Sequence, residues 1–122
     1  MSVIAKSSFL HYVNSNLEGT STFPNFTEEK TGIYEASSKY ADLIIKKSNS
    51  LNQLEFLHNN ILLFFYILDG SLKLILDNKE YQLTKNHSFA LPPNKRTCFI
   101  TESKVKFLQL SIPGKAEIRL VN

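Results

Sequence analysis

Hydrophobic and polar residues alternate along most of the chain after Tyr40. Between Ser71 and Leu76, for example, leucines occupy every second position, as in a strand with one buried face. Polar turns, several of them containing glycine or proline, separate such runs at short intervals. The pattern predicts β-strands over residues 41–47, 51–57, 61–68, 71–76, 79–83, 88–91, 97–101, 105–112 and 116–120.

The runs and their turns also indicate how the strands are arranged. Residues 61–68 are apolar on both faces, which favours a strand covered on both sides. Asp69-Gly70 predicts a tight turn, because glycine adopts positive φ without strain. Short strands joined by such turns predict an all-β fold, an antiparallel jelly-roll barrel.

The first forty residues lack this regular alternation and are polar and irregular. We expect residues 1–40 to form an N-terminal arm with the first strand or strands, and residues 41–122 to form the barrel. The spacing of apolar residues over 3–13 favours one short helix in the arm. A chain of 122 residues buries one modest core, so we expect one domain overall.

Composition excludes several classes of protein. Nine Phe and five Tyr exclude intrinsic disorder, and the single cysteine, Cys98, excludes a disulfide scaffold. The longest apolar run is too short to span a membrane, and no secretory signal is visible. We therefore expect a cytoplasmic protein with no membrane contact. A net charge of +3 with only two arginines does not predict DNA binding by this chain.

The segment from Phe65 to Asn94 resembles the central hairpins of a cupin barrel. Gly70 stands at the glycine of the first cupin turn, and Lys85-Asn-His87 stands where Lys-Gly-Asp is usual. Pro92-Pro93-Asn94 stands where Pro-Pro-Gly is usual, and asparagine also tolerates the left-handed region. The resemblance covers residues 58–112 and implies a cupin-like jelly-roll β-barrel.

Within the cupins, the chain resembles the N-terminal domains of AraC-family transcription regulators, which also begin with an irregular arm and often lack metal ligands. This resemblance implies a bacterial ligand-binding domain for effector sensing, dimerisation or both in transcription regulation. It also implies a possible small-molecule effector, DNA contact only through helix-turn-helix motifs outside this chain, and no enzymatic activity. The alternative is a stand-alone, metal-free small cupin that binds a small molecule or acts in sugar or small-molecule metabolism. A purely structural β-domain that binds a partner is a third interpretation.

Metal-binding cupins carry a His-x-His pair, a glutamate and a late histidine. Aligned on Gly70, these positions hold Phe56, His58, Leu63 and Thr97. A single histidine does not hold a catalytic metal, so we expect no metal, no cofactor and no catalytic residue. Cys98 has the pattern of a small core residue, with a redox-sensing thiol activated by nearby Lys95 and Arg96 as the alternative.

The interior of a jelly roll is the usual place for a ligand. We expect an apolar interior, which disfavours a sugar and favours an apolar effector or none. Lys95 and Arg96, in the loop after Pro92-Pro93, would meet an acidic ligand at the mouth of the barrel, unless they are merely solvated. The candidate ligand-binding residues are Phe56, His58, Phe65, Leu74, Lys95, Arg96 and Phe99.

The last predicted strand, residues 116–120, places Ala116, Ile118 and Leu120 on one apolar face. As the final strand it is a candidate for an unpaired sheet edge, and such edges pair with other chains. We therefore expect a two-fold homodimer. The alternative is a monomer in which this strand closes its own barrel.

Overall fold

The computed structural model describes residues 18–20 and 23–121. The helix expected over residues 3–13 lies outside this part of the chain. No helix within the described residues is long and apolar enough to cross a membrane. The elements, in chain order, are β2 (Glu18–Thr20), β3 (Thr27–Lys30), α1 (Ile33–Ala36), β4 (Asp42–Ser48), β5 (Asn52–His58), β6 (Leu62–Leu76), β7 (Lys79–Thr84), β8 (Ser88–Ala90), β9 (Thr97–Thr101), β10 (Val105–Ile112) and β11 (Ile118–Leu120).

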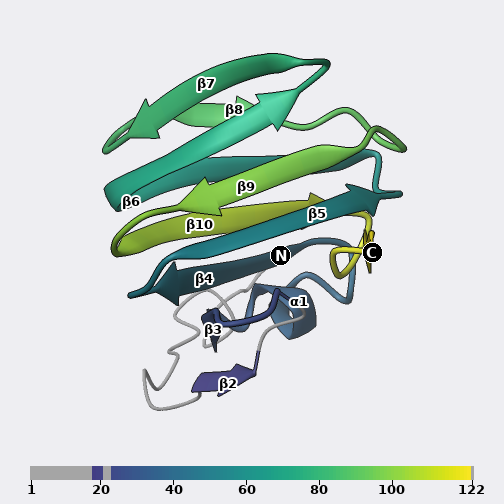
Figure 1. Cartoon of the computed structure of the whole chain (residues 1–122). Helices are drawn as coiled ribbons and strands as arrows, with labels where there is room; N and C mark the ends of the chain where they lie inside the picture. Colours follow the sequence, from purple (N-terminus) through teal and green to yellow (C-terminus); the bar gives the residue numbers. More distant parts are fainter. Residues whose placement is uncertain (1–17, 21–22, 122) are drawn as a thin grey trace.

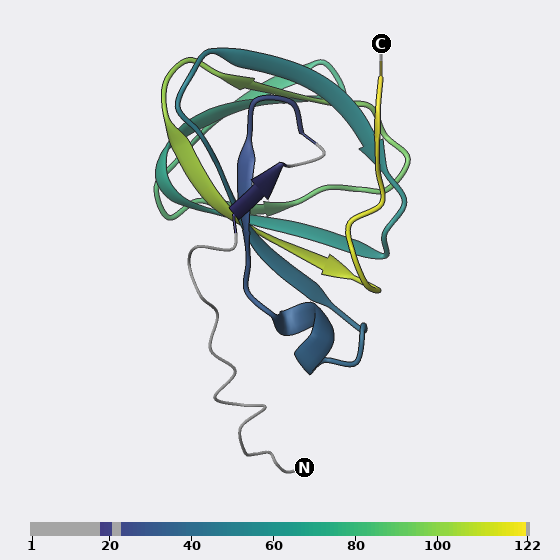
Figure 2. The same ribbon diagram turned by 90° about the horizontal axis from the view of Figure 1, so that it is seen from below.

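The strands form one antiparallel sheet that curls into a barrel-like jelly roll (Figures 1 and 2). Its order is β11-β5-β9-β6-β10-β4-β3-β2, with β7 and β8 also paired to β6. The prediction of an all-β fold is confirmed, and α1 is a single turn of four residues. The predicted strand over 105–112 has the same limits in the structure, and most others differ by one or two residues.

The long strand β6 connects the two layers of the jelly roll. Its first part pairs with β10 and β8, and its second part with β7 and β9. The turn predicted at Asp69-Gly70 is wrong, because the chain continues through it as a bent strand. Gly70 has φ +79, and the pairing with β10 skips Leu68, two residues before it. The bulge at Leu68 and the positive φ of Gly70 lie together where the strand bends between layers without reversing.

The turns that carry the cupin resemblance have the expected backbone conformation. Asn86 (φ 74) and Asn94 (φ 61) both lie in the left-handed region, at the positions where the cupin pattern has glycine. Asparagine adopts this conformation more readily than most residues. The substitutions of asparagine for glycine therefore preserve both turns.

Phenylalanine rings fill the centre of the barrel. Phe56, Phe65, Phe99 and Phe107 are fully buried, and the ring centroids of Phe56 and Phe99 lie 4.9 Å apart. Leucines on the inner face of β6 complete this core. The expectation of an apolar interior is confirmed for this part of the barrel.

Part of the predicted N-terminal arm also belongs to the core. Phe23 and Phe26 are buried, with Phe23 4.9 Å from Phe56 and Phe26 5.8 Å from Phe107, measured between ring centroids. The next residues form β3, which pairs with β4. Figure 2 shows β2 and β3 lying across one end of the barrel. The turn between them therefore closes this end with aromatic rings.

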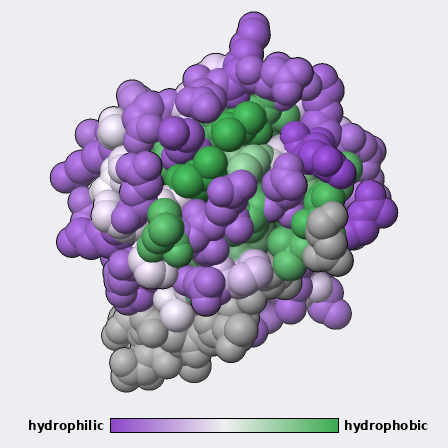
Figure 3. Space-filling view, viewed as in Figure 1, coloured by the Kyte–Doolittle hydropathy of each residue, from purple (hydrophilic) through white to green (hydrophobic). Residues whose placement is uncertain are grey.

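The last strand, β11, lies at the end of the sheet order and pairs with β5. Ala116 and Ile118 pack against the core, whereas Leu120 is 40% exposed. On the face shown in Figure 3, hydrophobic residues gather in the middle and hydrophilic residues frame them. The exposed large hydrophobic residues of the described chain are Tyr40, Leu51, Ile61, Tyr81 and Leu120.

Candidate functional site

The four positions that hold metal in other cupins are buried in the barrel. Phe56 lies directly opposite Thr97 in the pairing of β5 with β9, and Leu63 is fully buried. Only His58 has a side chain of the right type. Within the described residues, no group of three or more His, Cys, Asp and Glu side chains is placed to hold a metal ion. These residues do not fit the cupin metal.

His58 is held at the end of β5 by hydrogen bonds to both ring nitrogens. Its Nε2 lies 2.8 Å from the carbonyl oxygen of Leu91, and its Nδ1 accepts the backbone N–H of Asn60 at 3.1 Å. An accepting Nδ1 requires the neutral tautomer with the proton on Nε2. His58 is therefore a buried link between β5 and the segment before Pro92.

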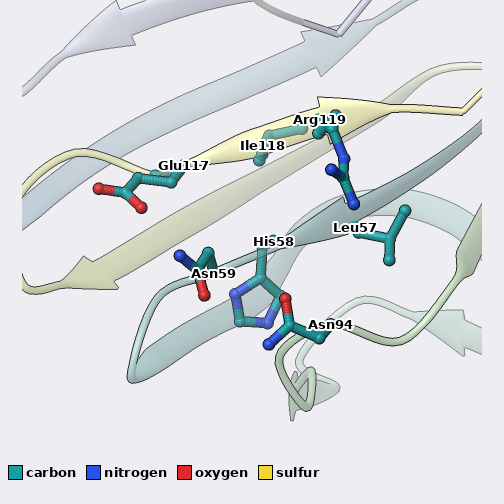
Figure 4. A pocket seen from close by; sticks show the side chains of 8 residues that line it. Leu57, His58, Asn59, Asn94, Glu117, Ile118 and Arg119 are labelled. Carbon is teal, nitrogen blue, oxygen red and sulfur yellow. The ribbon is translucent and has the colours of Figure 1, made fainter.

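A pocket of about 430 Å³ opens beside His58 (Figure 4). We call it the edge pocket. The side chains of His58 and Asn94 approach each other there, and the backbone N–H of Asn94 donates to the His58 carbonyl at 2.8 Å. The polar side chains around it are exposed, except that of His58. It is lined by Leu57, His58, Asn59, Asn94, Ala116, Glu117, Ile118 and Arg119.

The most unusual polar residue is inside the barrel. Lys46 points inward from β4 and is only 1% exposed. Its Nζ lies 3.7 Å from the centroid of the Phe23 ring. Among the described residues, none forms a hydrogen bond or ion pair with this ammonium group. Burial lowers the pKa of Lys46 to about 8, while the nearby carboxylates of Glu28 and Asp42 act in the opposite direction.

Gln109 points into the same interior from the neighbouring strand. It is 2% exposed, and its Oε1 is the one fully buried side-chain oxygen or nitrogen without a hydrogen-bond partner among the described residues. In the register of β4 with β10, Lys46 lies opposite Phe107 and Gln109 lies opposite Ile44. Lys46 and Gln109 are therefore diagonal neighbours on the inner face, with Cα atoms about 7–8 Å apart by sheet geometry. We call them the interior polar pair.

Two further polar residues continue this inner face towards the end of the barrel. Asp42 lies opposite Ser111, and the Ser111 hydroxyl donates to the Gly114 carbonyl at 2.7 Å. Burial raises the pKa of Asp42, and the positive charge of Lys115 opposes the rise. The inner faces of β4 and β10 thus carry a row of polar groups beside the aromatic core.

The residues expected to bind a ligand fall into separate places. The Phe99 ring contacts both Phe56 and Phe65, with the Phe65 and Phe99 centroids 5.4 Å apart, and Leu74 belongs to the same core. His58 lines the edge pocket. Ligand binding by these residues stays a prediction.

Lys95 and Arg96 lie elsewhere, on the outer surface. They border a pocket of about 350 Å³ together with Glu55, Ile75 and Cys98. Lys95 Nζ is 3.1 Å from Asp77 Oδ2. Both residues lie outside the barrel interior, and their contact with an acidic ligand stays a prediction.

Cys98 is buried, and burial raises the pKa of its thiol, with the charge of Glu55 acting in the same direction. The possibility that Lys95 and Arg96 activate this thiol is therefore not supported by its surroundings. A raised pKa keeps the thiol protonated and poorly reactive.

Neither a protein-family model nor a curated protein sequence matches this chain. Solved structures do match. Pac13 of Streptomyces, a nucleoside dehydratase solved with uridine, aligns with a TM-score of 0.73 at 12% identity, covering 92% of this chain and 91% of that chain. The polyketide cyclase RemF of Streptomyces resistomycificus aligns with a TM-score of 0.72 at 16% identity, covering 100% and 86%. A cupin-superfamily protein of Desulfitobacterium hafniense aligns with a TM-score of 0.63 at 13% identity, covering 78% and 84%.

These similarities establish the cupin jelly-roll fold for this chain. The expectation that the chain is not an enzyme is wrong. It rested on the lost metal ligands and on the AraC resemblance, whereas a dehydratase and a cyclase have the same fold at similar size. The link to AraC-family regulators stays a prediction, because none of these three structures is a regulator.

Proposed function

We propose that this chain is a cupin that binds and acts on a small organic molecule inside its barrel, at the interior polar pair. The molecule would carry a carbonyl or carboxylate oxygen next to a hydroxyl group. The oxygen would accept a hydrogen bond from Lys46 Nζ, and the hydroxyl would donate to Gln109 Oε1. One ligand would then form hydrogen bonds with both the Lys46 amine and the Gln109 amide oxygen.

The observation that carries this proposal is the unpartnered amide oxygen of Gln109 beside the buried amine of Lys46, which forms no ion pair. Burying an amine or an amide oxygen without a partner costs free energy, and buried polar groups in native proteins are nearly always paired. Here the amide oxygen of Gln109, which has no partner, and the buried amine of Lys46, which has only the Phe23 ring beside it, lie on adjacent strands and face the same interior. Apolar residues at both positions would stabilise the fold more, so their presence supports a role in binding.

The aromatic surroundings fit the same role. Phe23 covers the Lys46 amine, and Phe65 lies beside Gln109 in the register of β10 with β6. Small-molecule sites in proteins combine an apolar lining with a few convergent polar groups. Pac13, with the same fold, was solved with uridine, which is a small hydroxylated molecule.

Access to the pair would require the Phe23 side chain to move. Phe23 belongs to the turn 23–26, in which the Phe26 N–H donates to the Phe23 carbonyl at 3.3 Å. The Asn52 side chain anchors the turn by donating to the Pro24 carbonyl at 2.7 Å. Movement of this short turn, rather than of the barrel strands, would open the interior.

The test is a ligand screen by thermal unfolding. Sugars, nucleosides and small 2-oxo and 2-hydroxy acids are added to the wild type and to Lys46→Met and Gln109→Leu. We expect at least one compound to raise the Tm of the wild type and to lose this effect in both variants. A ligand at one hundred times its Kd stabilises a protein by about 2.7 kcal/mol, which a melting curve resolves.

The matched control is Arg119→Ala, which alters the edge pocket and leaves the barrel interior intact. The proposal predicts that this variant keeps the ligand-induced rise in Tm. If Arg119→Ala loses the rise while Lys46→Met and Gln109→Leu keep it, the ligand binds in the edge pocket and the proposal is wrong.

A further inference from the structure

The Lys46 amine is placed as a nucleophile rather than as a paired charge. Structural lysines in a core lie against carboxylates, whereas Nζ of Lys46 has only the face of Phe23 within contact distance among the interactions of the described residues. Glu28 lies opposite Lys46 in the pairing of β3 with β4, but no ion pair forms between them. Lysines that form Schiff bases are activated by just such desolvation.

We propose that Lys46 condenses with the carbonyl group of an aldehyde or ketone ligand to form an imine, a step that rests on the barrel site proposed above. The neutral Nζ attacks the carbonyl carbon and forms a C–N bond. The π electrons of the carbonyl move to its oxygen, which takes up the proton that nitrogen loses. The resulting carbinolamine then loses its hydroxyl group with one proton as water, leaving C=N. Amine and carbonyl are consumed, imine and water are formed, and no oxidant or reductant takes part.

Gln109 is positioned to assist this step. Its Oε1, which lacks a partner, would accept the hydrogen of the carbinolamine hydroxyl, and its side-chain NH₂ is a donor for the carbonyl oxygen of the incoming ligand. Because Gln109 and Lys46 are diagonal neighbours on adjacent strands, one small ligand spans both. Gln109 would therefore orient the carbonyl towards Nζ.

The burial of the site favours both formation and survival of the imine. Burial lowers the pKa of Lys46 to about 8, so about a tenth of the amine is neutral at pH 7 and about half at pH 8. The charged groups that act on it are Glu28 of β3 and Asp42 of β4, while the inner face of β10 carries no charged residue. The Phe23 ring and the neighbouring aromatic rings exclude the water that would hydrolyse the imine.

The test is reductive trapping on the full chain. The protein is incubated with glyceraldehyde or pyruvate at limiting concentration together with sodium cyanoborohydride, which delivers hydride to C=N and leaves a stable secondary amine. The adduct is counted by intact mass and located by peptide mapping. We expect one adduct per chain, at Lys46, formed at least tenfold faster than at any exposed lysine.

Lys46→Met should abolish this adduct, and the exposed Lys106→Met should leave it unchanged. Because peptide mapping of the wild type locates the adduct by itself, the test does not depend on the folding of either variant. Adducts spread evenly over the lysines would overturn the imine. If a ligand raises the Tm through Lys46 and Gln109 but nothing is trapped at Lys46, the imine fails and the binding site stands. If no compound raises the Tm through this pair, the proposed function itself fails.

Discussion

The proposed binding site consists of two residues, Lys46 and Gln109, and neither is distinctive in the sequence. Lys46 ends an apolar run in which leucine and isoleucine occupy both faces, so alternation does not decide which way it points. The same ambiguity applies to β10, where Leu108 and Leu110 alternate with Gln109 and Ser111. Hydrophobicity alone would turn the leucines inward. The pairing of β10 with β4 and β6 instead turns Gln109 and Ser111 inward, and the sequence of β10 alone does not predict this pairing.

The first prediction concerns the pH dependence of stability that Lys46 imposes. Its pKa is 10.5 when exposed and about 8 in the fold. Below pH 8 the folded protein bears the full cost of the buried charge, and this cost disappears as the pH rises from 8 to 10.5. The free energy of unfolding of the wild type, relative to Lys46→Met, should therefore rise by about 3 kcal/mol over this interval, at about 1.36 kcal/mol per pKa unit. Urea titrations at several pH values measure it.

The control for this prediction is Lys106→Met, which removes an exposed lysine of β10. Its stability curve should run parallel to that of the wild type. If the free energies of unfolding of Lys46→Met and the wild type change in parallel with pH, Lys46 is solvated and its pKa is not lowered by burial.

The second prediction concerns Gln109→Leu. Leucine has a similar size and removes an amide oxygen that has no partner in the described structure. Replacing an unsatisfied buried polar group by an apolar one of similar shape is neutral or stabilising. We expect the free energy of unfolding to stay constant or rise by about 1 kcal/mol in denaturant titrations. Phe99→Ala, which empties part of the core, should instead lower it by about 3–5 kcal/mol. A comparable loss for Gln109→Leu would mean that the amide has a structural role.

At the scale of elements, the sequence pattern is informative where turn chemistry and alternation agree. Strands 97–101 and 105–112 follow directly from it, because each strand has turn residues at both ends. The pattern is misleading at Gly70. A glycine with positive φ occurs at a bulged bend within a strand as well as in a turn that reverses the chain, and only the pairing with the neighbouring strand distinguishes the two. The burial of Phe23 and Phe26 was not predicted, because two aromatic residues in a polar segment show no periodicity.

The third prediction follows from the bulge in β6. A Cβ atom on Gly70 would lie 2.1 Å from the carbonyl oxygen of Lys104, and Gly70 also has φ +79. Gly70→Ala therefore combines a clash with backbone strain and should cost more than about 2 kcal/mol of unfolding free energy. Gly114→Ala is the matched control. At Gly114 (φ +66) the nearest atom lies at 3.4 Å, so we expect a cost of about 1 kcal/mol. An equal loss of unfolding free energy at the two positions would show that the bend in β6 does not depend on glycine at position 70.

For the molecule as a whole, the cupin resemblance predicted the architecture from residues 58–112, and the solved structures confirm it. The four residues aligned with the cupin metal ligands, Phe56, His58, Leu63 and Thr97, are all buried. Function did not follow from the same resemblance. One jelly roll serves many chemistries, so the function depends on individual side chains and not on the fold.

The fourth prediction concerns assembly. We propose that β11, at the edge of the sheet among the described strands, pairs with a second copy to form a two-fold dimer. Ile118 packs against the core, so its substitution would disturb the fold as well as the edge. Leu120, which is 40% exposed, is the cleaner site. Sedimentation velocity at tens of micromolar should show a dimer for the wild type and a monomer for Leu120→Glu. An identical monomer for both would exclude this edge.

An NMR titration of the ¹⁵N-labelled chain, with the compound that gives the largest rise in Tm, locates the bound ligand directly. The binding site proposed here predicts that the largest shifts occur in the side-chain amide of Gln109 and in the backbone amides of β4, β10 and the turn 23–26. Shifts confined to Asn59, Asn94 and residues 117–119 would place the ligand in the edge pocket and contradict binding at the interior polar pair.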